Sequence, residues 1–177
     1  MNGFKFFKQC FLLLALFSLT LSSCSKDDDE NASGDGGGEM TANISGVGSF
    51  KSFPASSNAV KQTIGSTSTM LTVQGTNSDG HGITMTIMGY TGEGTYDFTF
   101  GSVNSSSAIY TKTDVNNPMD TQSWSSQYMT GSTGTITISE ETDHGVEGTF
   151  SFKGKNGNDD SIKTISDGKF NVNFYSN

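Results

Sequence analysis

Histidine, the residue that most often serves as a metal ligand or a general base, occurs only twice in this chain. His81 follows the Asp79-Gly80 pair, and His144 lies between Glu140 and Gly145. Neither belongs to an H-x-H or H-E-x-x-H pattern, the kind of spacing that brings two imidazoles to one metal ion. We therefore expect both histidines to be exposed turn residues, and we predict no metal site.

Four acidic residues surround His144 and offer carboxylates to a hard cation. Calcium takes several oxygen ligands from a flexible loop, so a weak calcium site is one interpretation of this cluster. The other, which we favour, is a solvated hairpin end. The segment 156–160 is also rich in Asn and Asp, but it lacks the spacing and the terminal glutamate of an EF-hand loop. The four acids are Glu140, Glu141, Asp143 and Glu147.

The familiar catalytic arrangements are missing from the sequence. No serine lies in a G-x-S-x-G motif, and no strand-turn-helix pattern provides the elbow that this motif needs. Glycoside hydrolysis needs two carboxylates facing each other across a cleft, whereas Asp97 and Glu147 lie opposite the apolar face of a strand. Both cysteines precede residue 40, which leaves the rest of the chain without a thiol nucleophile. We predict that the protein is not an enzyme and uses no cofactor.

The segment Ser123–Tyr128 contains the most suggestive binding feature. On an extended strand Trp124, Ser126 and Tyr128 share one face. Two aromatic rings among polar neighbours could stack on a glycan, which makes Trp124 and Tyr128 candidate glycan contacts. The alternative, which we favour, is that both rings close the hydrophobic core, because aromatic residues dominate small β cores.

Residues 1–23 have the features of a secretion signal. Lys5 and Lys8 give a positive start, and Cys10–Leu21 is a mostly apolar run, too short to span a membrane but typical of a signal peptide. The sequence Leu21-Ser22-Ser23-Cys24 resembles a bacterial lipobox, in which cleavage occurs before a cysteine that carries diacylglycerol. An ordinary cleavage site beside an incidental cysteine is the alternative. We predict that Cys24 carries diacylglycerol and an N-acyl chain, which anchor the protein in the outer membrane.

An acidic, glycine-rich segment follows the predicted anchor and continues to Glu39. Such a composition is typical of a disordered tether. We therefore divide the chain into a signal peptide (1–23), the lipidated cysteine with its tether (24–39) and a folded domain (40–177). The first six residues of the tether resemble the export signal of Bacteroidetes lipoproteins displayed on the cell surface. A solvated spacer, with the protein on the periplasmic face, is the alternative. These six residues are Ser25, Lys26, Asp27, Asp28, Asp29 and Glu30.

The charge of the chain limits its partners. The formal net charge is −8 and there is no arginine. Proteins grip phosphate backbones with clustered lysine and arginine, so we predict no nucleic-acid partner. The predicted partners are the membrane, through the lipid, and a glycan or a surface protein.

Hydrophobic residues of the domain recur at every second position, which is the period of a half-buried strand. Asp79-Gly80 and Asp167-Gly168 each lie between two such runs, and Asp-Gly supplies the positive φ angles of tight hairpin turns. We predict an all-β fold, a single antiparallel sandwich or barrel of about ten short strands, without long helices. The clearest runs are Ile83, Met85 and Ile87; Tyr96, Phe98 and Phe100; Ile136 and Ile138; Phe150 and Phe152; and Phe170, Val172 and Phe174.

Gly94-Thr95-Tyr96, Gly134–Ile138, Val146–Phe152 and Ile165–Phe170 occur in this order along the domain. Together these four motifs resemble the landmarks of small flavobacterial lipoproteins that carry an uncharacterised β domain. The resemblance implies a β fold and no known activity. The tripeptide at Ser161 also matches a sequence that is O-glycosylated in secreted Bacteroidetes proteins. We expect a non-catalytic binding or structural module; the alternative is a barrel that encloses a small apolar ligand. The tripeptide is Asp160-Ser161-Ile162.

Overall fold

The structure is a computed structural model that describes residues 38–101 and 105–175. The predicted signal peptide, Cys24 and the predicted export signal lie outside these residues. Glu39, which the sequence placed at the end of the tether, is already the first residue of a strand. In the described part no helix is long and apolar enough to cross a membrane.

The predicted all-β fold is confirmed, and the described residues form eleven strands instead of about ten. The only helical segments among the described residues are two short 3-10 turns, η1 (Pro54–Ser56) and η2 (Ser126–Tyr128). In chain order the strands are β1 (Glu39–Ile44), β2 (Gly48–Lys51), β3 (Asn58–Ile64), β4 (Ser68–Thr76), β5 (His81–Met88), β6 (Gly94–Thr99), β7 (Ser107–Asp114), β8 (Asn117–Ser125), β9 (Ser132–Glu141), β10 (Gly145–Asn156) and β11 (Ile162–Asn173).

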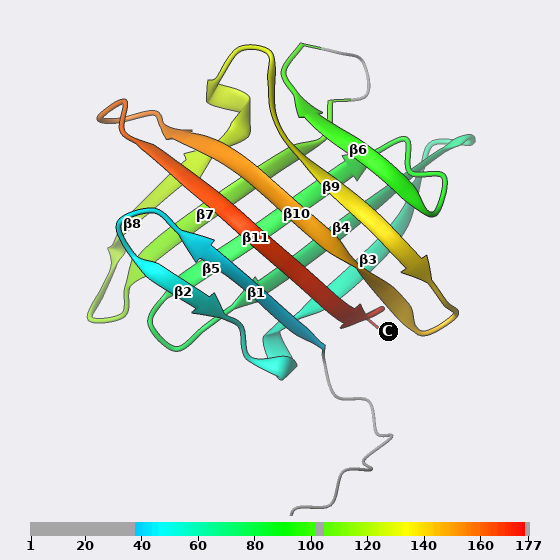
Figure 1. Cartoon of the computed structure of the whole chain (residues 1–177), viewed down its shortest axis with the longest axis horizontal. Helices are drawn as coiled ribbons and strands as arrows, with labels where there is room; N and C mark the ends of the chain where they lie inside the picture. Colours follow the sequence, from blue (N-terminus) through cyan, green and yellow to red (C-terminus); the bar gives the residue numbers. More distant parts are fainter. Residues whose placement is uncertain (1–37, 102–104, 176–177) are drawn as a thin grey trace, which may run out of the picture. The chain divides into compact units, whose positions relative to one another are not determined.

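The strands form one antiparallel sheet that folds over on itself into two layers (Figure 1). The back layer runs β3-β4-β5-β7-β8, and the front layer runs β2-β1-β11-β10-β9-β6. The long strand β10 joins the layers, because it pairs with β9 and β11 over most of its length and with β8 at Lys155 and Asn156. At the other side of the sheet, the Tyr175 amide donates to the Ala59 carbonyl over 2.8 Å, which brings the chain after β11 against β3.

Side chains from both layers fill the interior, as the period of two predicts. Ile83, Met85 and Ile87 of β5 are fully buried. The prediction for the run Tyr96, Phe98 and Phe100 holds for its first two residues only. Phe98 is fully buried and Tyr96 is partly buried, but Phe100 is 62% exposed. The reason is that β6 ends at Thr99, so Phe100 no longer lies on the inner face of a strand.

The Asp167-Gly168 pair does not form the predicted hairpin turn. Strand β11 runs through it without a break, and Asp167 adopts a φ of 53° inside the strand. The pairing with β10 shifts between Phe150 and Phe152, which makes this position a β-bulge. Bulges and tight turns both use a residue with positive φ. The pair at Asp79-Gly80 does form its predicted turn, between β4 and β5.

Two glycine–aromatic pairs shape the centre of the front layer. Gly148 lies opposite Phe170 in the register of β10 and β11, and Gly168 lies opposite Phe150. A Cβ atom on Gly148 would lie 2.6 Å from the Phe170 ring, and one on Gly168 would lie 2.6 Å from the Phe150 ring. The two rings therefore occupy the space that glycine leaves free on the neighbouring strand, with their centroids 6.3 Å apart.

Candidate functional site

The structure separates Trp124 from Tyr128. Strand β8 ends at Ser125, whose side chain accepts a hydrogen bond from the Gln127 amide and caps the η2 turn. The expectation that Trp124, Ser126 and Tyr128 share one strand face is therefore wrong. Trp124 is 4% exposed and belongs to the core, whereas Tyr128 is 59% exposed. The favoured core interpretation is confirmed for Trp124 and wrong for Tyr128; a glycan contact at Tyr128 stays a prediction.

Trp124 ends a stack of three rings that crosses the back layer from β8 to β5. Its ring lies on that of Tyr110, with centroids 5.2 Å apart and an angle of 25° between the planes. Tyr110 in turn stacks on His81, with centroids 5.8 Å apart and an angle of 7°. The Tyr110 hydroxyl lies 2.6 Å from His81 Nδ1. The expectation of an exposed turn histidine at position 81 is wrong, because His81 opens β5 and is partly buried.

The sequence contained a signal for His81 that the motif search missed. Its position is in phase with Ile83, Met85 and Ile87, the inward-facing residues of the same strand. Extending the period of two by one step places the His81 side chain on the inner face of the layer.

At the other end of the stack, the Trp124 ring contacts the connection between β10 and β11. Its Nε1 donates a hydrogen bond to Ser161 Oγ over 2.9 Å. Lys163 Nζ lies 5.6 Å from the centre of the Trp124 ring and donates to the Ser45 carbonyl over 3.0 Å. Trp124 is therefore held by stacking, by a hydrogen bond and by a cation–π contact. O-glycosylation of Ser161 stays a prediction, and its hydroxyl already accepts this bond.

The protonation of the stack follows from its environment. Burial raises the pKa of Tyr110 to about 12, so the phenol keeps its proton at neutral pH. Burial, and then the nearby Lys112, lower the pKa of His81, although Asp79 acts in the opposite direction. In the neutral tautomer with its proton on Nε2, His81 accepts a hydrogen bond from the Tyr110 hydroxyl at Nδ1; in the other tautomer Nδ1 donates to the hydroxyl oxygen.

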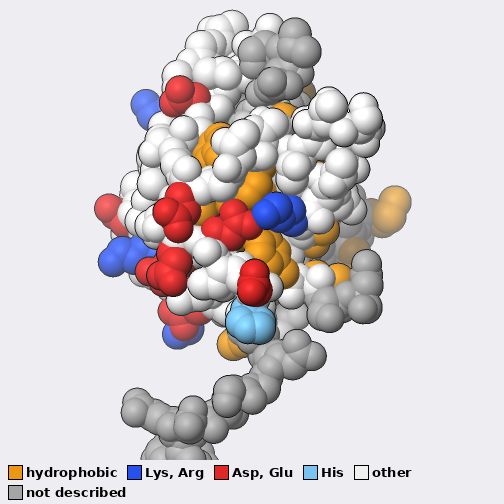
Figure 2. Space-filling view, turned by 90° about the vertical axis from the view of Figure 1, so that its right-hand side faces the viewer, with side chains coloured by type: hydrophobic (Ala, Val, Ile, Leu, Met, Phe, Trp, Pro, Cys, Tyr) orange, Lys and Arg blue, Asp and Glu red, His pale blue; other side chains and the backbone are white. Residues whose placement is uncertain are grey.

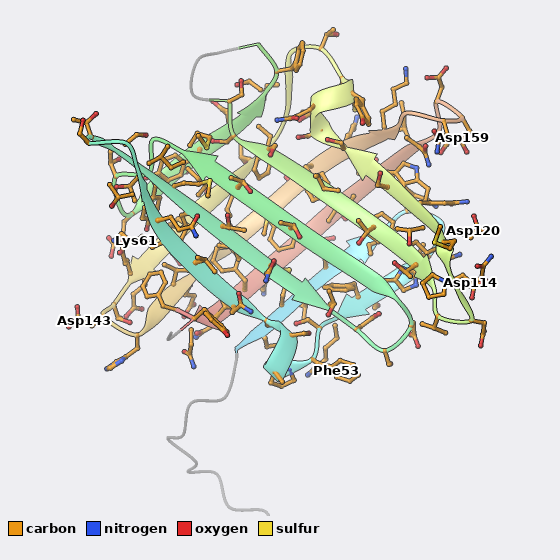
Figure 3. The ribbon with its side chains drawn as sticks, turned by 180° about the vertical axis from the view of Figure 1, so that it is seen from behind. Phe53, Lys61, Asp114, Asp120, Asp143 and Asp159 are labelled. Carbon is orange, nitrogen blue, oxygen red and sulfur yellow. The ribbon has the colours of Figure 1, made fainter. Side chains whose placement is uncertain are left out.

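Next to His81, a polar hollow of about 270 Å³ opens on the inward side of the hairpin formed by β7 and β8. Lys112 lies opposite both His81 and Gln122 in the register, so the hollow continues the face that carries the ring stack. Figure 3 shows Asp114 and Asp120 together at this edge of the molecule, far from Lys61. The residues that line the polar hollow are Asp79, Lys112, Thr113, Asp114, Val115, Asp120 and Gln122.

The polar hollow combines hydrogen-bond donors and acceptors. Its carboxylates accept, whereas the Lys112 ammonium and the Gln122 amide donate. Among the described residues Lys112 has no ion-pair partner within the molecule. Small-ligand sites use a few convergent polar groups to orient the ligand, and the polar hollow offers such groups on a lining whose one apolar side chain among the described residues is Val115. This arrangement fits a ligand with several hydroxyl groups.

A second polar cluster lies at the opposite end of the molecule, where Glu141 accepts hydrogen bonds from Lys61 and, over 2.7 Å, from the Tyr90 hydroxyl. Burial acts to raise the pKa of Glu141, but the bonds from Lys61 and Tyr90 outweigh it and lower that pKa. Lys61 Nζ also lies 5.5 Å from the centre of the Tyr90 ring and 6.0 Å from that of Phe174. Figure 2 shows acidic side chains beside a lysine over hydrophobic side chains at this end.

This cluster holds the layers together, because its groups are bonded to one another. The acids around His144 do not converge on one point: Glu141 is paired with Lys61, while Glu147 accepts from Asn171 over 3.1 Å on the outer face of the sheet. Within residues 38–101 and 105–175, no group of three or more His, Cys, Asp or Glu side chains is placed to hold a metal ion.

Fold and site together define a two-layer, all-β domain with a packed interior and a polar hollow at one edge. The chain belongs to the family described as domain of unknown function DUF6252, which matches residues 42–172. This match extends from β1 to β11. Comparisons with curated proteins and with solved structures found no match. An uncharacterised β domain is therefore confirmed, while the flavobacterial origin and the lipid anchor stay predictions.

Proposed function

We propose that this protein is a lipoprotein anchored in the outer membrane and displayed on the cell surface, and that its β domain is a non-catalytic module that binds a glycan. The observation that carries the proposed binding function is the polar hollow beside His81, where Lys112 and Gln122 can donate and three aspartates can accept hydrogen bonds. A sugar offers several hydroxyl groups, each of which both donates and accepts.

The packed interior favours a ligand at the surface over one inside the fold. Large side chains from both layers meet in the interior. Among them are Tyr110, Phe98 and Phe152, each of which is at most 2% exposed. A barrel that encloses an apolar ligand needs a lined cavity of several hundred Å³. The alternative of an internal apolar ligand therefore has no support in the packing of the described residues.

If the polar hollow binds a glycan, removing the side chains of Lys112 and Gln122 should weaken glycan binding. A Lys112→Ala, Gln122→Ala variant loses two donors, and the loss of a hydrogen bond from a charged donor costs about 1.5–3 kcal/mol. Binding of the detergent-solubilised full chain to immobilised oligosaccharides should fall about tenfold or more. Lys153→Ala, an exposed lysine on β10, is the matched control and should bind as the wild type does. Equal losses in both variants, or no binding by the wild type to any oligosaccharide, would contradict the proposal.

The lipid anchor is tested separately at Cys24. A serine at this position offers no sulfur for a thioether, so Cys24→Ser should abolish incorporation of a labelled fatty acid and leave the precursor uncleaved. Cys10→Ser, within the predicted signal peptide, is the control and should be labelled as the wild type is. Labelling that persists in Cys24→Ser would refute the anchor. Digestion of intact cells by an added protease separates the surface from the periplasmic face.

A further inference from the structure

The outer faces of the two layers differ sharply in charge. The front layer presents ionisable residues to solvent on each of its long strands, for example Lys169 on β11 and Glu147 on β10. The outward-facing side chains of β3, β4, β5 and β7, called the neutral face below, include no ionisable residue. They are Asn58, Val60, Gln62, Ile64, Ser68, Met70, Thr72, Gln74, Thr76, Thr84, Thr86, Met88, Ser107, Ile109, Thr111 and Thr113.

The neutral face is continuous, because its side chains meet in rows across the strands. One row runs Val60, Thr72, Thr86 and Ser107, and the next runs from Asn58 through Gln74 and Thr84 to Ile109. Apart from Gln62, Ile64 and Thr76, which are exposed, these side chains are partly buried by their neighbours. Figure 3 looks onto this layer, with its strands side by side and Lys61 at one edge.

We propose that the neutral face is the interface of a homodimer, in which two copies pack this face against each other. The cores of protein interfaces are depleted of charged residues, and the neutral face meets that condition. A chain with a net charge of −8 repels its own copies, and opposed carboxylates at an interface would be costly to desolvate. The neutral face lets two acidic copies meet without such a pair.

The area of the neutral face reaches what a specific dimer needs. The neutral face has sixteen side chains on four strands, about four on each strand. With neighbouring strands about 4.8 Å apart and residues of one face about 6.8 Å apart along a strand, it covers about 19 Å by 27 Å. Two copies would bury about 1,000 Å² in total, the lower limit for a specific interface. Methionine and β-branched side chains supply apolar contact, whereas no aromatic ring is present for a sugar to stack on. A second copy therefore fits this face better than a glycan does.

Cross-linking of the full chain in membranes tests the dimer directly. Thr84→Cys places a thiol near the middle of the neutral face, and packed sheets lie about 10 Å apart, within reach of a short bis-maleimide. We expect a cross-linked dimer from Thr84→Cys. We expect none from Thr149→Cys, whose thiol lies on the outer face of β10, or from the wild type. Equal cross-linking of the two cysteine variants would overturn the proposal.

Sedimentation of the detergent-solubilised full chain provides a second readout. Thr86→Lys sets like charges against each other across the interface and should convert the dimer to a monomer, whereas Thr149→Lys should leave the dimer intact. Circular dichroism confirms that both variants are folded. If Thr86→Lys unfolds the chain, the cross-linking of Thr84→Cys alone tests whether the neutral face is a dimer interface. A monomeric wild type at about 100 μM, or a Thr86→Lys variant that stays dimeric, would overturn the proposal, as would a neutral glycan that binds the face of a monomer.

Discussion

Replacing Trp124 with alanine is expected to lower the free energy of unfolding by about 3–5 kcal/mol. The side chain is 4% exposed and packs its ring on Tyr110. Alanine leaves a cavity beside Tyr110 and leaves Ser161 Oγ without the hydrogen bond from Nε1. Both effects add to the lost burial of a large ring. Urea denaturation of the full chain, followed by circular dichroism, measures the change, because Trp124 is the only tryptophan and its fluorescence is lost in the variant.

Tyr128→Ala is the matched control for this experiment. It also removes an aromatic ring only four positions away, but Tyr128 is 59% exposed. Substitution of an exposed side chain changes stability by about 0.5 kcal/mol or less. Trp124→Phe should fall between the two, because phenylalanine keeps an aromatic ring against Tyr110 but has no Nε1 donor. If urea denaturation gives Trp124→Ala and Tyr128→Ala the same free energy of unfolding, then Trp124 does not support the core.

The strands could be predicted from the sequence because burial repeats at every second residue wherever one face of a strand meets the core. The residues Ile83, Met85 and Ile87 illustrate the case, since each is fully buried. The period of two no longer predicts burial beyond the residue at which a strand ends. Phe100 continues the alternation in the sequence, but the chain leaves β6 at Thr99. Tyr128 likewise continues a pattern that stops when Ser125 caps the η2 turn.

Local sequence could not distinguish the bulge at Asp167 from a hairpin turn. Both need a positive φ, and Asp-Gly provides it in either case. The choice depends on the partner strand: β10 is long enough to pair with both halves of β11, so β11 continues through the bulge. The sequence also could not predict how the sheet folds over into two layers. It depends on the pairing of β8 with β10 at Lys155 and Asn156, residues far from β8 in the sequence.

None of the residues that line the polar hollow was predicted from the sequence as part of a site, and in the ring stack beside it only Trp124 was singled out. Its neighbours Tyr110 and His81 lie on different strands and 14 or more positions away, and no motif connects them. The polar hollow likewise draws on a turn before β5 and on both strands of the β7–β8 hairpin. Such a site exists only after long-range pairing, which a search for spaced motifs does not detect. The phase of His81 with the buried residues of β5 was the one local signal.

Replacing Gly148 with alanine is expected to destabilise the protein by about 3 kcal/mol, the upper part of the range for overpacked cores. The added Cβ would lie 2.0 Å from the Thr137 carbonyl oxygen on β9 and 2.6 Å from the Phe170 ring on β11. Neither neighbour has free space to move into, because Gly148 lies on the strand between them. Gly157→Ala is the matched control: its closest contact is the exposed Tyr128 ring at 3.2 Å, which can turn away. Urea denaturation of both variants measures the difference.

A second substitution separates the two clashes of Gly148→Ala. Phe170→Leu shortens the side chain that meets the new methyl group, but it leaves the Thr137 carbonyl where it is. If the ring were the whole obstacle, Gly148→Ala in the Phe170→Leu background would cost little more than Phe170→Leu alone. We expect most of the cost to remain, because the backbone oxygen belongs to a paired strand and cannot rotate away as a side chain can. Additivity of the two changes would place the constraint in the pairing of β9 with β10, whereas full rescue would place it in the glycine–aromatic pair.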